Sequence, residues 1–271
     1  MSKSMAAEEL QLLAVTRTSE VWKSVASVIM TIVDEASFEA GPAGLTFRSM
    51  DPSHIALIDL NWPNSTFEKY ECPSTIKFGL KISDFAKIMK RANSGDSMEI
   101  SLKNNSLNIK TSGSYIRNYK MNLIENADAN ASPLPKLSFD SKIVIGTSVL
   151  DKILTDVQMV SDNVSIETVA GKEVLTFTGA ADNGNATVVI DDDNANKKND
   201  TENHRLLQEI TVKETSKATY NMEYILKIVK VLSSASENIT LEYSSKKPLR
   251  LEFILFGSLK MQFFLAPRVD K

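Results

Sequence analysis

The sequence predicts an α+β protein of two similar domains, each made of a duplicated β-α-β-β-β unit. Four segments carry an amphipathic helical pattern, and strand-like sequence flanks each one: Glu20–Asp34, Ser83–Ala92, Ser148–Val160 and Met222–Ser234. Their starts, at positions 20, 83, 148 and 222, lie 63, 65 and 74 residues apart. This near-constant spacing favours four copies of one unit, although an α+β protein of this size can also contain four helices by chance.

The helical segments share one design, with an apolar stripe on one side and lysines on the other. In the second segment Phe85, Ile88 and Met89 recur at helical spacing, and Lys87 and Lys90 fall on the opposite face. The apolar stripes are expected to pack on sheets. The outward faces are then basic in a chain whose net charge is −3, which indicates contact with a polyanion. The alternative is an ordinary solvated surface.

One strand is expected before each helix and three after it, separated by polar turns. In the first half these strands are Leu10–Thr16, Ser37–Ala40, Leu45–Met50, Ile55–Trp62, Thr75–Leu80, Met98–Leu102, Ser106–Thr111 and Tyr115–Leu123. In the second half they are Leu137–Ile145, Val164–Val169, Val174–Thr178, Ala186–Ile190, Ile210–Tyr220, Ile239–Tyr243, Leu249–Phe256 and Leu259–Leu265.

Two polar segments without periodicity interrupt this order. Residues 125–136 are small and polar and contain Pro133 and Pro135, as expected of a connector between domains. A polar loop at 191–203 accounts for the longer third spacing. The predicted domains are therefore residues 11–124 and 137–271, after an N-terminal extension at 1–10. Leu134, the one large apolar residue of the connector, either packs on the nearest domain or takes part in binding.

The composition is that of a globular protein, with 42% hydrophobic and 24% charged residues. Because Cys72 is the only cysteine, no disulfide can form within the chain, and a reducing compartment is expected. The first residues lack the apolar core of a signal peptide. The most apolar run, Leu251–Pro267, contains Glu252, Lys260 and Gly257. We expect two buried strands around a tight turn there, rather than a membrane span.

The sequence offers no grouping of residues that would support catalysis. His54 and His204 are the only histidines, and a structural or binding role explains His54 better than acid–base chemistry. Dinucleotide-binding and P-loop glycine motifs are absent. The run from Asp191 resembles a calcium loop, but Lys197 stands where glycine is required and Asn203 where the closing glutamate would be. One cysteine and two distant histidines disfavour zinc. We expect neither an enzyme nor a bound cofactor or metal.

Five segments match a known protein family. Residues 45–62 read Leu-Thr-Phe-Arg-Ser-Met-Asp-Pro-Ser-His-Ile-Ala-Leu-Ile-Asp-Leu-Asn-Trp. The other matching segments are Phe85–Lys90, Tyr119–Leu123, Pro248–Phe253 and Phe264–Pro267. On these residues the chain resembles the sliding clamps of the proliferating cell nuclear antigen family, of the archaeal and eukaryotic type. The resemblance covers residues 11 to 269.

This resemblance implies a processivity factor of DNA replication and repair that encircles duplex DNA. In such clamps three subunits join head to tail in a ring, with helices around the central hole and sheets outside. Their DNA contacts reach phosphates and carry no sequence information. The positions implied to face DNA are Lys23, Lys87, Lys90, Arg91, Lys152, Lys227 and Lys230. Met30, Thr155 and Met159 occupy other positions that are usually basic, so a less basic channel is expected.

The resemblance also implies a pocket for short peptides carried by DNA polymerase, the clamp loader, flap endonuclease and DNA ligase. Its residues here would be Met50, His54, Ile55, Leu57, Leu134, Pro135, Phe139, Pro248, Phe264, Leu265, Ala266 and Pro267. No membrane partner is implied. The expected location is the cytoplasm, with the nucleoid, in a prokaryote and the nucleus in a eukaryote.

Two segments are expected to be edge strands at opposite ends of the protomer, Tyr115–Leu123 and Asn185–Ile190. Bare edges invite pairing, and head-to-tail pairing of two different edges can close a ring. We therefore expect a homotrimer whose interface contains Tyr115, Arg117, Tyr119, Met121, Ala186, Val188 and Ile190. Two alternatives stay open: one specialised subunit of a heterotrimeric clamp ring, and a nucleic-acid-handling enzyme subunit that borrowed the fold.

Overall fold

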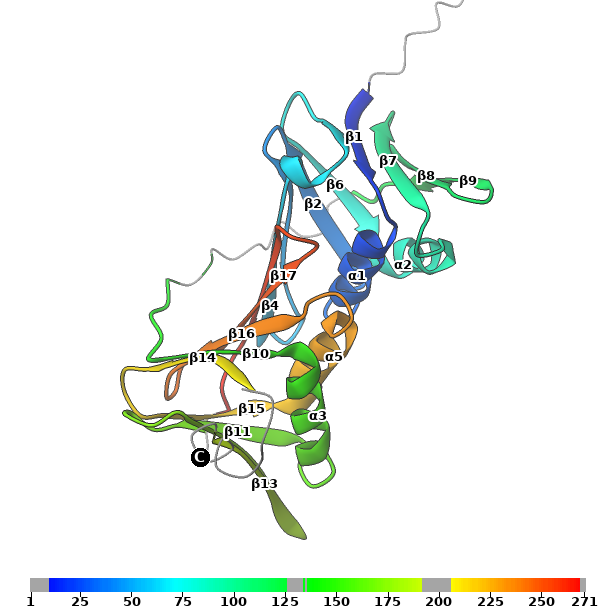
Figure 1. Cartoon of the computed structure of the whole chain (residues 1–271). Coiled ribbons are helices and arrows are strands. Elements are labelled where there is room, and N and C mark those ends of the chain that lie inside the picture. The colour runs from blue at the N-terminus through cyan, green and yellow to red at the C-terminus, as the bar shows by residue number, and fades with distance from the viewer. Residues whose placement is uncertain (1–9, 126–133, 135, 192–205, 269–271) are drawn as a thin grey trace, which may run out of the picture. The chain divides into compact units, whose positions relative to one another are not determined.

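The computed structural model describes residues 10–125, 134, 136–191 and 206–268. These residues fall into two units (Figure 1). The first unit comprises residues 10–49, 59–125 and 257–259, and the second comprises 50–58, 134, 136–191, 206–256 and 260–268. A short piece of the N-terminal half, residues 50–58, therefore belongs to the second unit.

The first half of the chain contains two successive β-α-β-β-β runs. The first run is β1 (Leu10–Thr16), α1 (Glu20–Ile29), β2 (Glu35–Gly41), β3 (Gly44–Met50) and β4 (Ala56–Pro63). The second is β6 (Ile76–Lys81), α2 (Ile82–Arg91), β7 (Ser97–Lys103), β8 (Ser106–Ser112) and β9 (Ile116–Asn122). Between the runs lie a 3-10 turn, η1 (Asn64–Thr66), and a short strand, β5 (Lys69–Glu71).

The second half repeats this order. Its first run is β10 (Ser141–Gly146), α3 (Thr147–Gln158), β11 (Asn163–Thr168), β12 (Val174–Ala181) and β13 (Gly184–Asp191). Its second run is β15 (Ser216–Asn221), α5 (Met222–Leu232), β16 (Asn238–Tyr243), β17 (Leu249–Leu255) and β18 (Leu259–Leu265). The additional strand β14 (Leu207–Val212) lies between them.

Antiparallel strands and two helices build the first unit. One sheet has the order β5-β1-β7-β8-β9, and elsewhere β6 pairs with β2 and β2 pairs with β3. Helices α1 and α2 pack against each other, and α2 also packs on β2 and β6 (Figure 1). The core is aromatic, because the ring of Trp22 lies 4.5 Å from that of Trp62 and 6.1 Å from that of Phe85. The apolar helix faces are thus buried, as their periodicity predicts.

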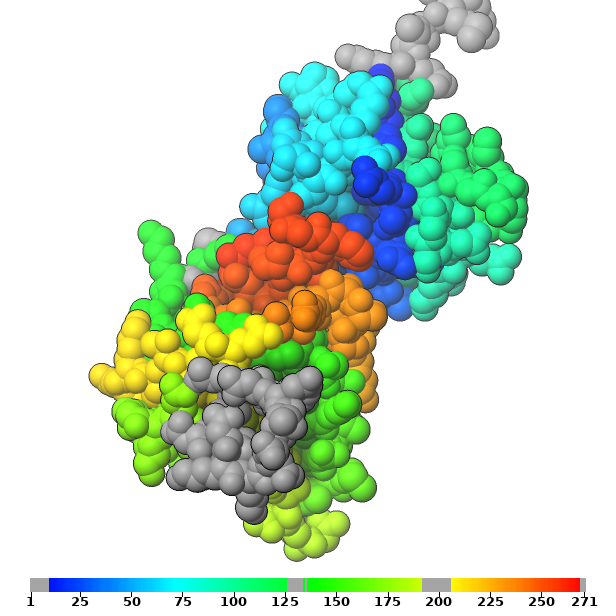
Figure 2. Space-filling view, viewed as in Figure 1, coloured from blue at the N-terminus to red at the C-terminus, as the bar shows by residue number. Residues whose placement is uncertain are grey.

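The second unit is built in the same way. One sheet has the order β13-β12-β11-β15, and a second set of strands runs β14-β10-β16-β17-β18. Helix α3 contacts α5 and all of the strands β10 to β13. In the space-filling view the orange surface of α5 lies against the green surface of α3 (Figure 2). The largest fully buried side chains of this unit are Phe177, Tyr220, Tyr243, Phe253 and Phe263.

The predicted α+β class and the duplicated strand order are confirmed, but the first helix is shorter than predicted. Helix α1 ends at Ile29 rather than at Asp34. The N–H groups of Thr31 and Ile32 bond to carbonyls three residues back, both at 3.0 Å, so the chain tightens into turns. Ile32 remains buried, 9% exposed, which explains why the apolar stripe continues beyond the helix.

The prediction of one strand at Ile210–Tyr220 is wrong. This segment belongs to two strands, β14 and β15, which pair with β10 and β11 and lie in different sheets. Both β14 and β5 are short strands that the repeat pattern did not include, and each pairs antiparallel with the first strand of its half. The expected strand at Leu137–Ile145 also starts later, at Ser141.

The apolar run near the C-terminus forms two strands, as predicted. β17 and β18 are separated by a turn in which Phe256 and Gly257 have φ angles of 48° and 93°. The side-chain amide of Gln262 donates a hydrogen bond to Glu252 across this hairpin, at 2.7 Å. Within the described ranges, no helix has the length and apolar character needed to span a membrane.

Several predicted features lie outside the described residues. These are residues 1–9 of the N-terminal extension, residues 126–133 and Pro135 of the connector, residues 192–203 of the polar loop, His204, and residues 269–271.

Candidate functional site

The predicted basic residues all lie on helices α1, α2, α3 and α5. Six side chains are exposed and Lys23 is half-buried; the exposed ones are Lys87, Lys90, Arg91, Lys152, Lys227 and Lys230. Each therefore presents charge to solvent, which contact with a polyanion requires.

Two of these lysines pair with acidic residues of their own helices. Lys87 lies 2.9 Å from Asp84, and Lys227 lies 2.6 Å from Glu223. The hydrogen bond that Lys87 donates to Asp84 raises the pKa of Lys87 above its usual value. Both pairs are exposed, so they are weak and leave the lysines able to exchange partners.

The helices differ in charge. Helix α2 contains three basic residues and one acidic residue, whereas α3 contains Lys152 with two aspartates. Thr155 is exposed on α3, and Met159 at its C-terminal end is 85% exposed. The basic character therefore resides mainly on α2 and α5, and α3 contributes little.

The turn after β3 is organised by a buried carboxylate. Asp51 is 3% exposed, and its Oδ1 accepts hydrogen bonds from the N–H groups of Ile55 and Ala56 at 2.8 and 2.7 Å. Its Oδ2 accepts one from the N–H of Ser53 at 3.1 Å. Burial alone would raise the pKa of Asp51, but these hydrogen bonds outweigh it and the pKa is lowered. The carboxylate thus stays charged and shapes the turn.

This turn exposes two of the predicted pocket residues. His54 has a φ of 58°, in the left-handed region that costs a side chain free energy, and it is exposed. Ile55 is 37% exposed, which is unusual for its type. Its carbonyl accepts a hydrogen bond from the N–H of Ala266 at 2.8 Å, so the turn lies beside the end of β18. The fourth donor to Asp51 is the hydroxyl of Tyr224 on α5, at 3.0 Å.

Phe139, Pro248 and Ala266, three further predicted pocket residues, lie on neighbouring segments of the second unit. The Lys247 ammonium donates to the carbonyl of Ser138 at 2.8 Å, which brings the turn before β17 to the segment before β10. The Arg250 guanidinium lies 5.2 Å from the ring centre of Phe139. Because β17 and β18 form a hairpin, Pro248 lies at the same end of it as Ala266.

Burial divides the predicted pocket residues into two groups. The surface group is exposed or half-buried: Met50, His54, Ile55, Leu134, Pro248, Ala266 and Pro267. The buried group is Leu57, Phe139, Phe264 and Leu265, all between 1% and 8% exposed. The side chains of the buried group belong to the core of the protein and add little exposed area to the predicted pocket.

The two predicted edge strands are edges of their sheets. β9 ends the order β5-β1-β7-β8-β9, and β13 ends the order β13-β12-β11-β15. The pairs next to the two hairpin loops are Ser112 with Ile116 and Ala181 with Gly184. Both are hydrogen-bonded pairs. A non-hydrogen-bonded pair at this position would need hydrogen bonds between its neighbours on either side, and on one side those neighbours are loop residues.

Alternation along the strands then fixes which backbone groups point outward. On β9 these belong to Arg117, Tyr119 and Met121, three of the predicted interface residues. On β13 they include those of Asn185, Thr187 and Val189. The backbone groups of Ala186, Val188 and Ile190 instead bond to β12, so any role of these three residues in an interface must come from their side chains.

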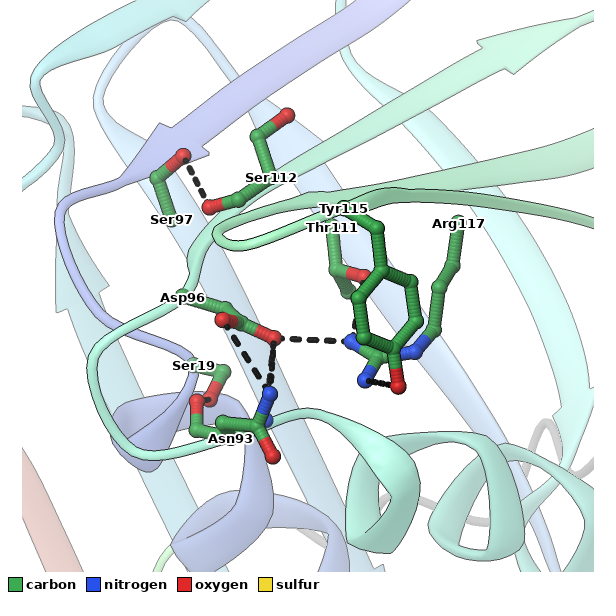
Figure 3. Close-up of polar contacts among 8 residues, drawn as sticks. All are labelled: Ser19, Asn93, Asp96, Ser97, Thr111, Ser112, Tyr115 and Arg117. Carbon is green, nitrogen blue, oxygen red and sulfur yellow. Dashed lines mark hydrogen bonds and ion pairs between the residues drawn. The ribbon is translucent and has the colours of Figure 1, made fainter.

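An ion pair anchors the start of β9. Arg117 Nη1 lies 2.8 Å from Asp96 Oδ2, and the two side chains are only 13% and 5% exposed. The guanidinium carbon also lies 4.0 Å from the ring centre of Tyr115, over its face (Figure 3). Asp96 accepts the N–H of Asn93 at 3.0 Å, and Ser19 donates to the carbonyl of Asn93 at 2.7 Å. The edge strand is thereby tied to the turn after α2 and to the start of α1.

The two edge hairpins carry opposite charge. Residues 106–122 contain Lys110, Arg117 and Lys120 and no acidic residue, which gives +3. Residues 174–191 contain Asp182 and Asp191 and no basic residue, which gives −2. Attraction between unlike edges and repulsion between like edges follow from these signs.

Sequence reasoning missed Asp51, Tyr224 and Asp96. An aspartate before Pro52 is a recognisable turn signal, because its side chain can accept backbone N–H groups further along. Tyr224 and Asp96 have no such local signal, since their partners lie far away in the sequence. No group of three or more histidine, cysteine, aspartate or glutamate side chains suited to hold a metal occurs among the described residues.

Comparison with known proteins fits this arrangement. Family models for the N-terminal and C-terminal domains of proliferating cell nuclear antigen (PCNA) match residues 12–130 and 133–268. The DNA polymerase sliding clamp of Nitrosopumilus maritimus is 45% identical over 257 residues, which cover 95% of this chain and 98% of that protein.

Two solved structures share the fold. PCNA from Thermococcus kodakaraensis superposes with a TM-score of 0.85 at 24% identity and covers 95% of this chain and 100% of its own. A structure of A. fulgidus PCNA with the C-terminal region of FEN-1 bound gives 0.83 at 24%, covering 96% and 99%. The chain therefore belongs to the PCNA family. It is a DNA sliding clamp, an accessory protein of DNA polymerase in replication, and clamps of this family are non-catalytic.

Proposed function

We propose that this clamp works as a homotrimeric ring in which β9 of one subunit pairs with β13 of the next. The observation that carries the proposal is the pair of unlike edges, one at +3 and the other at −2, each with outward backbone groups. Unlike edges favour head-to-tail contacts over contacts between two copies of one edge. Residues 11–124 and 137–271 would be the two clamp domains, joined by the connector at 125–136.

Native mass spectrometry of the purified chain tests this assembly. A homotrimer has three times the subunit mass of 30.0 kDa, or about 90 kDa. A chain that stays at 30.0 kDa at micromolar concentration would overturn the proposal and favour a specialised subunit of a heterotrimeric ring.

The ring would hold duplex DNA through the helix lysines. Each lysine that neutralises a phosphate adds about 0.9 to the slope of log affinity against log salt. We expect alanine at Lys87, Lys90, Lys227 and Lys230 to weaken retention on closed circular DNA and to flatten this slope. The matched control replaces four exposed strand lysines, Lys69, Lys77, Lys217 and Lys260, which changes the net charge equally. Equal slopes in the two variants would mean that the helix lysines are an ordinary solvated surface.

The surface around Ile55, Pro248 and Ala266 would receive short peptides of DNA polymerase, the clamp loader, flap endonuclease and DNA ligase. The A. fulgidus relative with the FEN-1 C-terminal region bound supports this proposal. Exposed apolar residues contributed by separate segments are typical of a docking surface. Leu134→Asp should abolish peptide binding measured by calorimetry and leave the trimer intact. Unchanged affinity would show that the connector lies outside the binding surface.

Its action would depend on encircling DNA and tethering partners, without catalysis or a cofactor. The protein would act where the chromosome lies: in the cytoplasm, with the nucleoid, of a prokaryote or in the nucleus of a eukaryote.

A further inference from the structure

We propose that Tyr224 is a positioning residue through which helix α5 holds the peptide-binding turn at residues 51–56 in its receptive shape. The inference rests on the proposed peptide site and deepens it. It follows from one long-range contact, the hydrogen bond from the Tyr224 hydroxyl to Asp51 Oδ2, which joins residues 173 positions apart.

The donors to Asp51 are of two kinds. Those from Ser53, Ile55 and Ala56 are backbone groups of the turn itself, so they shape the turn without fixing it to the rest of the unit. The hydroxyl of Tyr224 comes from α5, a helix whose residues Ile225 and Ile228 are each 1% exposed. A buried carboxylate thus ties a surface turn to a well-packed helix.

The turn needs this support because its backbone is strained. His54 has a φ of 58°, and the neighbouring Ile55 holds an apolar side chain at the surface. Strained conformations persist only where the surroundings determine them. Without the tyrosine hydroxyl, Oδ2 keeps the 3.1 Å bond from Ser53, and the bond from the N–H of Ala266 to the Ile55 carbonyl still ties the turn to the end of β18.

The same helix carries two of the proposed DNA-facing lysines. Tyr224 follows Glu223, which pairs with Lys227, and Lys230 lies one turn further along. A direct hydrogen bond therefore links the turn that would bind partners to the helix that would contact DNA. A displacement of α5 would reach the turn through this bond, and the coupling would be reciprocal.

Tyr224→Phe tests the inference, because it removes the hydroxyl and keeps the ring. Its matched control is Tyr243→Phe, which removes a buried hydroxyl bonded to Thr168 at 2.9 Å in the same unit, away from the turn. Peptide affinity is measured by calorimetry with a synthetic peptide of the FEN-1 C-terminal region, the segment bound to the A. fulgidus relative. Hydrogen exchange is followed at the amides of residues 53–56.

We expect Tyr224→Phe to weaken peptide binding about tenfold, since affinity falls with the population of the receptive state. We also expect faster hydrogen exchange at the amides of residues 53–56. Tyr243→Phe should change neither. Peptide affinity within twofold of wild type, together with unchanged exchange, would overturn the inference. If the wild type itself fails to bind the peptide, the proposed function fails, and the exchange measurement still decides whether Tyr224 holds the turn.

Asp51→Asn gives an independent test. The asparagine carbonyl can still accept from Ile55 and Ala56, but its amide group faces the N–H of Ser53. Because both substitutions remove the bond from the Tyr224 hydroxyl to the Asp51 carboxylate, their effects on peptide affinity should add only in part in the double variant. Full additivity would show that Tyr224 acts on peptide binding by another route.

Discussion

The β8–β9 hairpin of the first unit and the β12–β13 hairpin of the second both end a sheet, but they are built differently. β9 is exposed or half-buried along its whole length, and an ion pair between Arg117 and Asp96 fixes its start. β13 buries Ile190, and a two-residue loop, Asp182 and Asn183, sets its register. The hairpins also differ in charge, +3 against −2.

These differences show how an exposed edge strand can pair with one kind of partner strand and not with others. Two copies of the same edge strand carry charge of the same sign. They therefore repel each other and pair less well than two different edges do. An edge strand can pair with an edge of the opposite sign, and repetition of such a contact closes a ring. The asymmetry of the two hairpins thus favours head-to-tail assembly.

The largest expected effect comes from removing an outward donor on β13. Thr187→Pro deletes an N–H that points away from β12, which costs ~1–3 kcal/mol per interface, or on the order of 10- to 100-fold in affinity. We expect monomers by native mass spectrometry. Thr187→Val keeps the N–H and should remain trimeric. A trimeric proline variant would place the interface on another surface.

A smaller effect is expected from the anchor of β9. Arg117→Ala leaves Asp96 without its partner and frees the start of the strand, so the trimer should dissociate at about tenfold higher concentration. Sedimentation equilibrium measures this change. Lys110→Ala removes the same charge from the same hairpin without touching the anchor. Equal weakening in both variants would mean that charge alone matters and that the anchor does not.

Acid should weaken the same anchor. The hydrogen bond from Asn93 lowers the pKa of Asp96 below its ordinary value of 3.8, and Arg117 lowers it further, although burial acts in the other direction. A lowered pKa means that the contribution to stability is fully present above pH 3.8 and is lost as pH falls through the lower folded value. The trimer should loosen in that window, and Arg117→Ala should show less pH dependence. Equal pH dependence in both proteins would contradict this assignment.

The smallest effect is expected from the exposed charges. Lys120→Glu lowers the β8–β9 hairpin from +3 to +1 and should weaken the trimer about two- to fivefold at low salt, since exposed charge pairs are weak. Asp182→Lys in the same chain should restore part of the loss. Lys246→Glu, in the exposed turn between β16 and β17 and outside both hairpins, is the control. A loss that persists unchanged in high salt would not be electrostatic.

The sequence by itself determined the class, the order of the elements and the family. Apolar stripes at Phe85 and Met89 or at Ile225 and Val229 specify helices that pack on sheets, because side-chain periodicity is a local property that the chain carries into any fold. The same reasoning placed both edge strands and found the exposed lysines of α2. Sequence reasoning wrongly predicted a single strand where β14 and β15 lie. The strand-like pattern continues across both, and only the sheet that each strand joins distinguishes them.

The tertiary structure alone decided which distant groups meet. It assigned residues 50–58 to the second unit, placed the hydroxyl of Tyr224 on Asp51, and paired Arg117 with Asp96. It also decided that the outward backbone groups of β13 include those of Asn185, Thr187 and Val189. Each of these facts depends on register or on a contact across many residues, and both are set by packing of the whole unit rather than by any local pattern.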